Sequence, residues 1–273
     1  MSSGEPSLRT QKNKNKPLAN NLSEPTAPIF VRQSPEVGVL LLHSFTSTPY
    51  EMRELAYYLA KRGISVYAPL LAGHGTTPAD LSKMRIEDWQ ESVEQAYLLL
   101  RQHVKKIFVV GSSFGGNLAF HLATKFTNPL SGIVSMGTPI KVRWQKFFKT
   151  GLYSYGLFKK NQKKRRQDYR MVYDEKDQVV YPVMPTVSLR RFFKFIKQIT
   201  IPTLSKVTVP TLIIQSSHDR IVDSRSASYI HQNLAATDKR IFWMNGSSHA
   251  LTVDDKRELL FNRIYHFIVE KAG

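Results

Sequence analysis

From residue 37 onward the chain alternates short apolar runs with amphipathic stretches, and this pattern restricts the fold more than any other feature. The first apolar run, Val37 to Leu42, has the length of a fully buried strand, and a helix is predicted next from Tyr50 to Lys61. Buried strands that alternate with helices form a mostly parallel sheet covered by helices on both faces. The sequence therefore predicts the α/β class.

Further elements continue the same alternation, and no internal repeat is visible. The predicted strands are Ser65–Ala68, Ile107–Val110, Gly132–Met136, Thr211–Gln215 and Ile241–Met244. The predicted helices are Ile86–His103, Gly115–Lys125, Arg225–Leu234 and Asp254–Glu270. At 273 residues the chain is long enough for one large domain with an insertion.

Changes in composition and in the pattern of apolar residues divide the chain into a leader, a core and an insertion. Residues 1–28 are polar, with scattered lysine and asparagine, and are predicted to be a disordered leader. Residues 29–138 and 203–273 form the predicted core. Residues 139–202 are too many for a simple connection and carry aromatic and apolar side chains, so we expect them to fold as a basic, helical cap.

The composition excludes several classes of site. The chain has no cysteine, which excludes a disulfide framework, a thiolate zinc site and a cysteine nucleophile. No run of about 18 apolar residues is present, so no bilayer-spanning helix is expected. The first residues lack the apolar region of a secretory signal. These observations favour the cytoplasm and leave peripheral contact with a membrane open.

One motif carries chemistry, and it lies where a strand meets a helix. Gly111-Ser112-Ser113-Phe114-Gly115 follows the apolar run Ile107–Val110 and matches the G-x-S-x-G nucleophile elbow. The serine of such an elbow stands on a strained turn, where side chains at the flanking positions would collide with the neighbouring strand and helix. A glycine-rich phosphate loop would instead need Gly-Lys-Ser or G-x-G-x-x-G, and neither is present. We therefore predict Ser113 as a nucleophile.

A serine hydroxyl needs a histidine to take its proton, and the histidine needs a carboxylate to hold it in one tautomer. Of the eight histidines, His249 lies in a small-residue loop between the last strand and the closing helix. Asp219 directly follows the strand Thr211–Gln215, which gives the chain order serine, acid, histidine. Asp223 is the rival, although it also precedes a helix that it could cap.

An oxyanion hole completes this chemistry, with one amide after the nucleophile and one from a loop after an early strand. Phe114 supplies the first amide, and Phe45 is the best candidate for the second. The predicted reaction needs no metal or cofactor.

These residues resemble the bacterial monoacylglycerol lipases and related short-chain carboxylesterases of the α/β-hydrolase fold. The resemblance runs from about Val37 to Phe267 and rests on five motifs in the family's order. They are His43-Ser44-Phe45-Thr46-Ser47, Gly73-His74-Gly75, Gly111-Ser112-Ser113-Phe114-Gly115-Gly116, His218-Asp219 and Ser248-His249.

The resemblance implies Ser113 as nucleophile, Asp219 as acid and His249 as base, with the amides of Phe45 and Phe114 as the oxyanion hole. It also implies a lid between the sixth and seventh strands. Within Gly73-His74-Gly75, we expect His74 to be structural rather than catalytic. The sequence departs from the family at Ser44 and Ser47, where glycine is typical. Because serine tolerates fewer backbone conformations than glycine, the geometry of the hole is left open.

The function predicted from these residues is hydrolysis of small acyl esters, with monoacylglycerols as the leading candidates, through an acyl-serine intermediate. A thioesterase or acyltransferase would use the same residues with a different leaving group or acceptor. From another class, the chain could be a catalytically silent binding protein of the same fold. Reaction with a fluorophosphonate separates the two classes, because only an activated serine reacts.

The positive charge of the chain is concentrated in the insertion. Residues 141–200 contain 16 lysines and arginines against 4 acidic residues, a charge of +12 out of a formal +18. Bases alternate with aromatic residues from Arg190 to Phe195. A solvated lid is the ordinary interpretation of such charge. Contact with anionic lipid is the sharper one. Nucleic acid is a third and weaker one, since no helix-turn-helix, zinc or RNP pattern is present.

Overall fold

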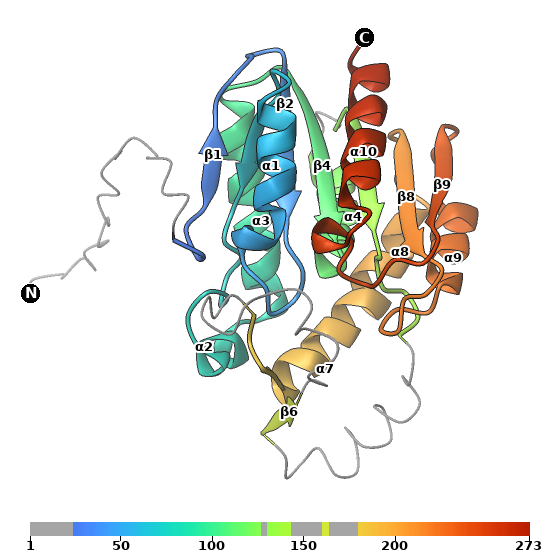
Figure 1. Ribbon diagram of the computed structural model, residues 1–273. Helices are drawn as coiled ribbons and strands as arrows, with labels where there is room; N and C mark the ends of the chain where they lie inside the picture. The colour runs from blue at the N-terminus through green and yellow to red at the C-terminus, as the bar shows by residue number, and fades with distance from the viewer. Residues whose placement is uncertain (1–23, 127–129, 143–159, 164–179) are drawn as a thin grey trace, which may run out of the picture.

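The computed structural model describes residues 24–126, 130–142, 160–163 and 180–273. Within these ranges the core is a seven-stranded sheet in the order β1-β3-β2-β4-β5-β8-β9 (Figure 1). Only β1 is antiparallel to its neighbour, so the mostly parallel sheet predicted from the sequence is confirmed. The strands are β1 Ile29–Val31, β2 Val37–Leu42, β3 Ser65–Ala68, β4 Lys106–Ser112, β5 Gly132–Met136, β8 Thr211–Ser216 and β9 Lys239–Met244.

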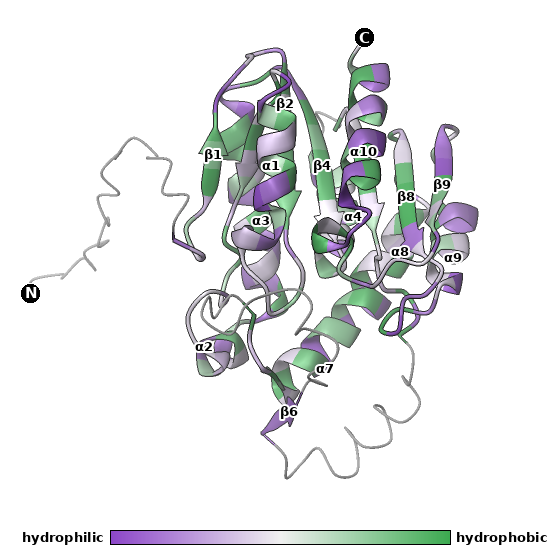
Figure 2. Cartoon of the chain, in the orientation of Figure 1, coloured by the Kyte–Doolittle hydropathy of each residue, from purple (hydrophilic) through white to green (hydrophobic). Residues whose placement is uncertain are grey.

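Helices cover both faces of the sheet, because side chains of a buried strand alternate between the two faces. In β2, Val39 and Leu41 pack toward one cluster of apolar side chains, and Leu40 and Leu42 toward the other. Figure 2 shows hydrophobic residues along the strands and hydrophilic ones on the outer sides of the helices. The first face carries α1 Arg53–Ala60 and α10 Arg257–Ala272, and the second carries α3 Ile86–Arg101, α4 Phe114–Lys125 and α9 Arg225–Asn233.

The described part of the insertion lies between β5 and β8, at the carboxyl ends of the parallel strands (Figure 1). Its strands β6 Asn161–Lys163 and β7 Val183–Pro185 pair antiparallel, so the described part of the cap is not entirely helical, contrary to the helical cap predicted from the sequence. The chain then continues through α7 Thr186–Phe195, the π-helical turn η2 Ile196–Thr200 and α8 Ile201–Leu204.

Polar and aromatic contacts fix α7 to the core. The Ser188 hydroxyl donates to the Leu81 carbonyl at 3.0 Å, near the end of α2 Pro78–Lys83. The Arg191 guanidinium donates to the carbonyls of Ser82 and Met84, at 2.7 and 2.8 Å. The carbonyls at the end of a helix have no amide partner within that helix. Arg191 therefore caps the C-terminus of α2 and at the same time anchors α7.

The orientation of the aromatic residues in α7 differs from the sequence interpretation. Phe192 is 7% exposed and Phe195 is fully buried, and their rings pack on Phe114 at centroid distances of 5.4 and 5.3 Å. Helical periodicity turns these rings to the core and leaves Lys194 and Lys197 in solvent. Phe192 and Phe195 are therefore core anchors, whereas Phe193 is only partly buried.

The remaining predicted elements are present, with bounds that differ by a few residues. The helix predicted from Tyr50 is divided into a 3-10 turn, η1 Pro49–Met52, and α1. The closing helix begins at Arg257, because a 3-10 turn, η3 Leu251–Val253, precedes it. The short elements β1 and α2 were not predicted, although Thr77-Pro78 is a typical helix start. Most of the predicted leader, residues 1–23, and much of the predicted cap lie outside the described residues.

In the described part of the chain, no helix is long and apolar enough to cross a bilayer.

Candidate active site

Ser113 lies on the turn between β4 and α4, with φ of 49° and ψ of −113°. A positive φ is uncommon for a residue with a side chain, because Cβ crowds the backbone. The Ser113 amide donates to the Met136 carbonyl at 2.7 Å, and the Ser113 carbonyl accepts from the Gly116 amide at 3.0 Å. The tight strand-to-helix turn that the motif predicts is present, and neighbouring backbone holds it.

The glycines of the motif allow α4 to approach the sheet closely. An added Cβ at Gly115 would lie 2.2 Å from the Leu42 carbonyl oxygen at the end of β2. One at Gly111 would lie 2.3 Å from the carbonyl carbon of Gly115. Both distances are far below van der Waals contact, so only glycine fits at either position.

Asp219 and His249 form a direct pair. His249 Nδ1 lies 2.7 Å from Asp219 Oδ2, which also accepts from Gln215 Nε2 at 3.1 Å. The other carboxylate oxygen accepts the amides of Ile221 and Val222, each at 2.8 Å. The carboxylate therefore has partners for both oxygens, although the residue is only 1% exposed.

These partners decide the charge of Asp219. Burial by itself raises the pKa of this carboxyl group. The charge of His249, its hydrogen bond and the two backbone amides act in the opposite direction and outweigh burial, so the pKa lies below the ordinary aspartate value. Asp219 is therefore ionised at neutral pH and can accept a hydrogen bond from the protonated Nδ1 of His249.

The loop of His249 meets the loop of Ser113 around Gly137, the residue after β5. An ideal Cβ on Gly137 would lie 3.4 Å from His249 Cε1, so the imidazole lies against this residue. Its chain neighbour, Met136, accepts the Ser113 amide. The structure thus brings the loops of Ser113, Asp219 and His249 together at the carboxyl ends of β4, β8 and β9.

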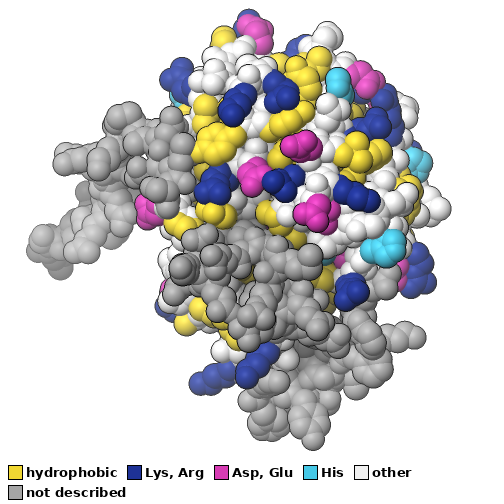
Figure 3. All heavy atoms as spheres, in the orientation of Figure 1, with side chains coloured by type: hydrophobic (Ala, Val, Ile, Leu, Met, Phe, Trp, Pro, Cys, Tyr) yellow, Lys and Arg dark blue, Asp and Glu magenta, His cyan; other side chains and the backbone are white. Residues whose placement is uncertain are grey.

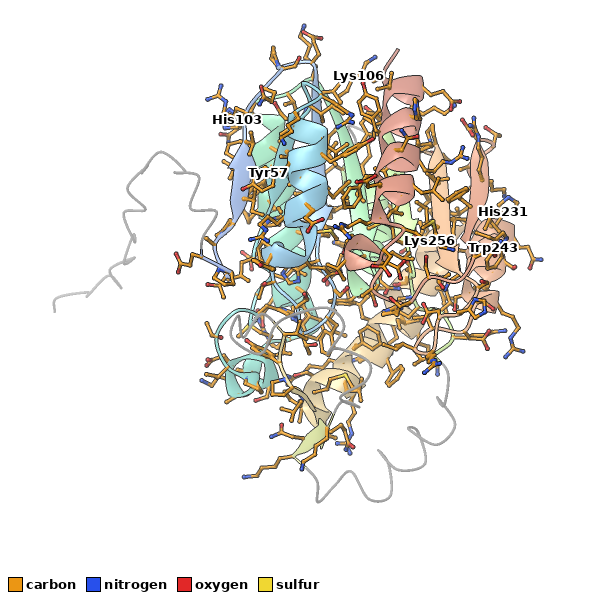
Figure 4. All side chains as sticks on the ribbon, viewed as in Figure 1. Tyr57, His103, Lys106, His231, Trp243 and Lys256 are labelled. Carbon is orange, nitrogen blue, oxygen red and sulfur yellow. The ribbon has the colours of Figure 1, made fainter. Side chains whose placement is uncertain are left out.

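Two charged residues brace the histidine loop from the side of α10. Asp254 accepts the amide of Ser248 at 2.9 Å and that of Lys256 at 3.1 Å. Lys256, labelled near the lower end of α10 in Figure 4, donates from Nζ to the Asn245 carbonyl at 2.5 Å. The loop between β9 and α10 is held at both ends.

Asp223, the rival carboxylate, has a different partner. Its side chain forms an ion pair with Arg225, whose Nε lies 3.0 Å from both carboxylate oxygens. It also accepts the Arg225 amide at the start of α9, at 3.0 Å. Asp223 therefore serves the helix start, and Asp219 is the carboxylate that contacts His249.

The loops that carry Phe45 and Phe114 are neighbours because β2 and β4 pair, with Leu42 opposite Gly111. The Phe45 and Phe114 rings pack edge to face, with centroids 5.6 Å apart. Phe114 is the first residue of α4, where the amide has no partner within the helix and the helix dipole is positive. Of the two amides predicted for the oxyanion hole, that of Phe114 lies in the elbow itself and that of Phe45 lies on the neighbouring loop.

Ser44 and Ser47 do not carry the backbone strain that the departure from glycine suggested. Among the described non-glycine residues, positive φ occurs only at Thr46 (67°) and Ser113. Ser44 instead uses its side chain: the hydroxyl donates to Glu51 Oε1 at 2.7 Å and lies 3.0 Å from the Ser112 hydroxyl. Sequence reasoning missed Glu51, since no motif marks it.

His43 and His74 occupy structural positions beside the candidate oxyanion loop. His43 Nδ1 lies 2.9 Å from the Ser44 carbonyl, and Nε2 accepts the Leu71 amide at 3.1 Å. The His43 and His74 rings pack at 5.1 Å, and the His74 ring is also edge to face with Phe45 at 5.9 Å. Both histidines are buried, and His74 has the packing role expected for it.

No group of three or more His, Cys, Asp or Glu side chains is placed to hold a metal ion in the residues described.

Comparison with protein families gives a match over residues 33–256 to the family described as serine aminopeptidase, S33. The match includes the elbow, the acid loop and the histidine loop. The chain belongs to this family. It is a serine hydrolase with the α/β-hydrolase fold, as its sequence predicts.

Two relatives of this chain with known names belong to the same class of enzyme, the serine hydrolases. A thermostable monoacylglycerol lipase from Bacillus sp. (strain H-257) is 33% identical over 90% of this chain and 95% of its own length. A carboxylesterase from Bacillus subtilis (strain 168) is 29% identical over 88% of this chain and 95% of its own length. These relatives are carboxylic ester hydrolases.

Solved structures agree on the fold. One of two metagenome-derived lipolytic enzymes, LipS and LipT, has a TM-score of 0.80 and 28% identity, and covers 89% of this chain and 97% of its own. A monoglyceride lipase from Saccharomyces cerevisiae has a TM-score of 0.76 at 17% identity, over 90% of this chain and 92% of its own.

The buried environment of His43 gives a testable prediction for this hydrolase. Burial lowers the pKa of His43 to about 4, and its bond to the Ser44 carbonyl offsets only part of this shift. The unfolded chain binds this proton near pH 6.5, so acidification below that value favours unfolding. By NMR, the His43 ring should keep its neutral, Nδ1-protonated signals from pH 8 to 5.5. A titration midpoint near 6.5 would contradict the buried neutral imidazole.

Proposed function

We propose that Ser113, His249 and Asp219 form the catalytic triad of an esterase that acts on monoacylglycerols or other short to medium acyl esters. The observation that carries this proposal is the buried, ionised Asp219 in contact with His249, beside a serine on a strained elbow. The amides of Phe45 and Phe114 complete the proposed site as an oxyanion hole. The two Bacillus relatives support the choice of ester as substrate.

In the proposed reaction, His249 Nε2 takes the hydroxyl proton of Ser113 as the oxygen attacks the ester carbonyl carbon. The carbonyl oxygen becomes an oxyanion and accepts hydrogen bonds from the Phe45 and Phe114 amides. His249 then gives its proton to the leaving alcohol, and an acyl-serine remains. Water then attacks the acyl carbon while His249 takes its proton, His249 returns that proton to Ser113 Oγ, and the carboxylic acid leaves. Asp219 stabilises the imidazolium in both halves.

The side chains around the proposed site favour an apolar acyl group. Phe45, the partly exposed residue of the proposed hole, packs its ring on the buried rings of Phe114 and of Phe192 in α7, with centroids 5.6 and 5.2 Å away, so the surface next to the hole is apolar. A thioesterase or acyltransferase would use the same residues. Hydrolysis rates for a chain-length series of monoacylglycerols, simple esters and acyl-thioesters separate these possibilities.

Removal of the proposed nucleophile tests the esterase assignment. Ser113→Ala should fold like the wild type and lower kcat by about 10⁶, the scale seen when a triad serine is removed. The same variant should no longer react with a fluorophosphonate, which labels only an activated serine. Near-normal turnover by a folded Ser113→Ala variant would rule out this nucleophile. A wild type that neither labels nor hydrolyses esters would favour a silent binding protein.

The two carboxylates provide a matched pair of variants. Asp219→Asn places an amide beside Nδ1 and favours the wrong tautomer of His249, so kcat should fall by about 10⁴. Asp223→Asn weakens the ion pair with Arg225 and a contact at the start of α9, neither of which involves His249, so kcat should stay within about threefold. Steady-state kinetics with one soluble ester measures both. A larger loss for Asp223→Asn in folded protein would reverse the assignment of the acid.

We also propose that residues 139–202 act as a cap whose basic surface contacts anionic lipid. Among the described residues, Lys160, Lys163, Lys194 and Lys197 are exposed. Figure 3 shows basic side chains projecting at the lower end of the molecule, whereas basic and acidic side chains are interspersed over the upper part. Further positive charge of the cap comes from residues outside the described part of the chain, among them Lys164, Arg165 and Arg166.

Charge reversal tests the lipid proposal. Lys194→Glu with Lys197→Glu should weaken binding to acidic vesicles about tenfold or more, since each base near such a surface contributes about 1 kcal/mol. The control is Lys61→Glu with Lys206→Glu, exposed residues that precede β3 and β8 at the opposite end of the sheet. Co-sedimentation measures binding, and a soluble ester checks that turnover is preserved. Equal binding of the wild type to neutral and acidic vesicles would contradict the lipid proposal and would indicate that the basic surface is only solvated.

A further inference from the structure

Glu51 is a buried carboxylate that the proposed reaction does not use. It lies in η1, is 5% exposed and directs both oxygens at one residue of the candidate oxyanion loop. Oε2 accepts the Ser44 amide at 2.9 Å, and Oε1 accepts the Ser44 hydroxyl at 2.7 Å. No lysine or arginine in the described part of the chain forms an ion pair with Glu51.

The hydrogen bonds continue from Ser44 to the elbow. The Ser44 hydroxyl has one hydrogen, which goes to Glu51, so the Ser112 hydroxyl is the donor in the 3.0 Å contact with Ser44. The chain of bonds therefore runs from Ser112, the residue before the proposed nucleophile, through Ser44 to the carboxylate. It links the loop after β2 to the elbow after β4.

This arrangement also fixes the direction of the Phe45 amide. Ser44 C=O and Phe45 N–H belong to one planar trans peptide and point in opposite directions. The Ser44 carbonyl accepts from His43 Nδ1 at 2.9 Å and from the Ser47 amide at 3.1 Å. Glu51 holds the other side of Ser44, its amide and hydroxyl. With both sides of Ser44 held, the Phe45 N–H has one orientation.

Burial of this carboxylate needs compensation. A buried carboxylate costs several kcal/mol unless hydrogen bonds offset the loss of water. Hydrogen bonds to an ionised acceptor are about twice as strong as neutral ones. The two bonds from Ser44 provide that compensation, and they restrain the loop next to the proposed hole.

We propose that Glu51 is a positioning residue for the oxyanion hole, which acts through Ser44 to orient the Phe45 amide. The proposal rests on the function proposed above. An oxyanion forms only in the transition state, so a misplaced donor lowers kcat and leaves KM nearly unchanged.

The test compares Glu51→Gln with Ser44→Ala, and Glu54→Gln is the control. Glutamine can accept from the Ser44 amide, but its NH₂ group cannot accept from the hydroxyl. Kcat for a soluble ester should fall roughly 10- to 100-fold, below the 10² to 10³ lost when a donor is removed outright. KM should stay within about threefold. Glu54 is an exposed carboxylate paired with Arg257, so Glu54→Gln should keep wild-type kinetics.

A double-variant cycle adds a readout that general destabilisation would not move. Ser44→Ala keeps the amide bond to Glu51, removes the hydroxyl and should lower kcat by a smaller factor. If Glu51 acts through Ser44, adding Ser44→Ala to Glu51→Gln should cost little more. Folded Glu51→Gln with kcat within twofold of wild type would overturn the proposal, as would fully additive losses. If Glu51→Gln fails to fold, an unchanged kcat in Ser44→Ala overturns it.

The outcome is separable from a failure of the proposed function. If wild-type protein does not hydrolyse the ester, or if Ser113→Ala still does, the function itself is wrong. If the wild type is active through Ser113 and the Glu51 and Ser44 variants match it, only the positioning role is wrong.

Discussion

The close contact between α4 and the end of β2 is the constraint on which the rest of the site depends. Gly115 allows the helix backbone to reach the Leu42 carbonyl, and Gly111 leaves room for that helix beside β4. With α4 this close, the chain must turn between Ser112 and Phe114 in very little space, and Ser113 takes a positive φ. The same approach places the first amides of α4 beside the loop after β2. One steric fit thus sets the position of both the serine and the helix end.

The loops around the elbow are held in a common way, by carboxylates that accept backbone amides. Asp219 binds the amides of Ile221 and Val222, and Asp254 binds that of Ser248. Glu51 binds that of Ser44. Each carboxylate restrains the loop that its partners belong to, and the charge makes those bonds stronger than neutral ones. The loops that leave the strands are held in this way in the fixed geometry that electrostatic catalysis requires.

The sequence predicted most of the fold because that information is local. Val37–Leu42 and Ser65–Ala68 are short, mostly apolar runs, and the structure forms strands with those bounds. The elbow was recognisable because glycine and serine at fixed spacing have a steric meaning. The approach of Asp219 and His249 followed from chain order, since both loops leave the same edge of a parallel sheet.

The features that the sequence did not predict depend on contacts between distant segments. Glu51 resembles any helical glutamate until Ser44 and Ser112 are placed beside it, and burial is a property of the folded chain. The aromatic residues of α7 looked suited to a lipid surface, but their helical phase turns Phe192 and Phe195 inward. The strain in the loop after β2 falls on Thr46, although the two serines were the positions that departed from glycine.

The central claim is that Ser113 attacks a carbonyl whose oxygen is received by two amides. A crystal structure of the protein after reaction with an alkyl phosphonate tests it most directly, because the adduct is tetrahedral like the transition state. The account predicts phosphorus bonded to Ser113 Oγ and one phosphonyl oxygen about 2.7–3.1 Å from the nitrogens of both Phe45 and Phe114. An adduct on another residue, or a phosphonyl oxygen that faces away from these amides, would contradict it.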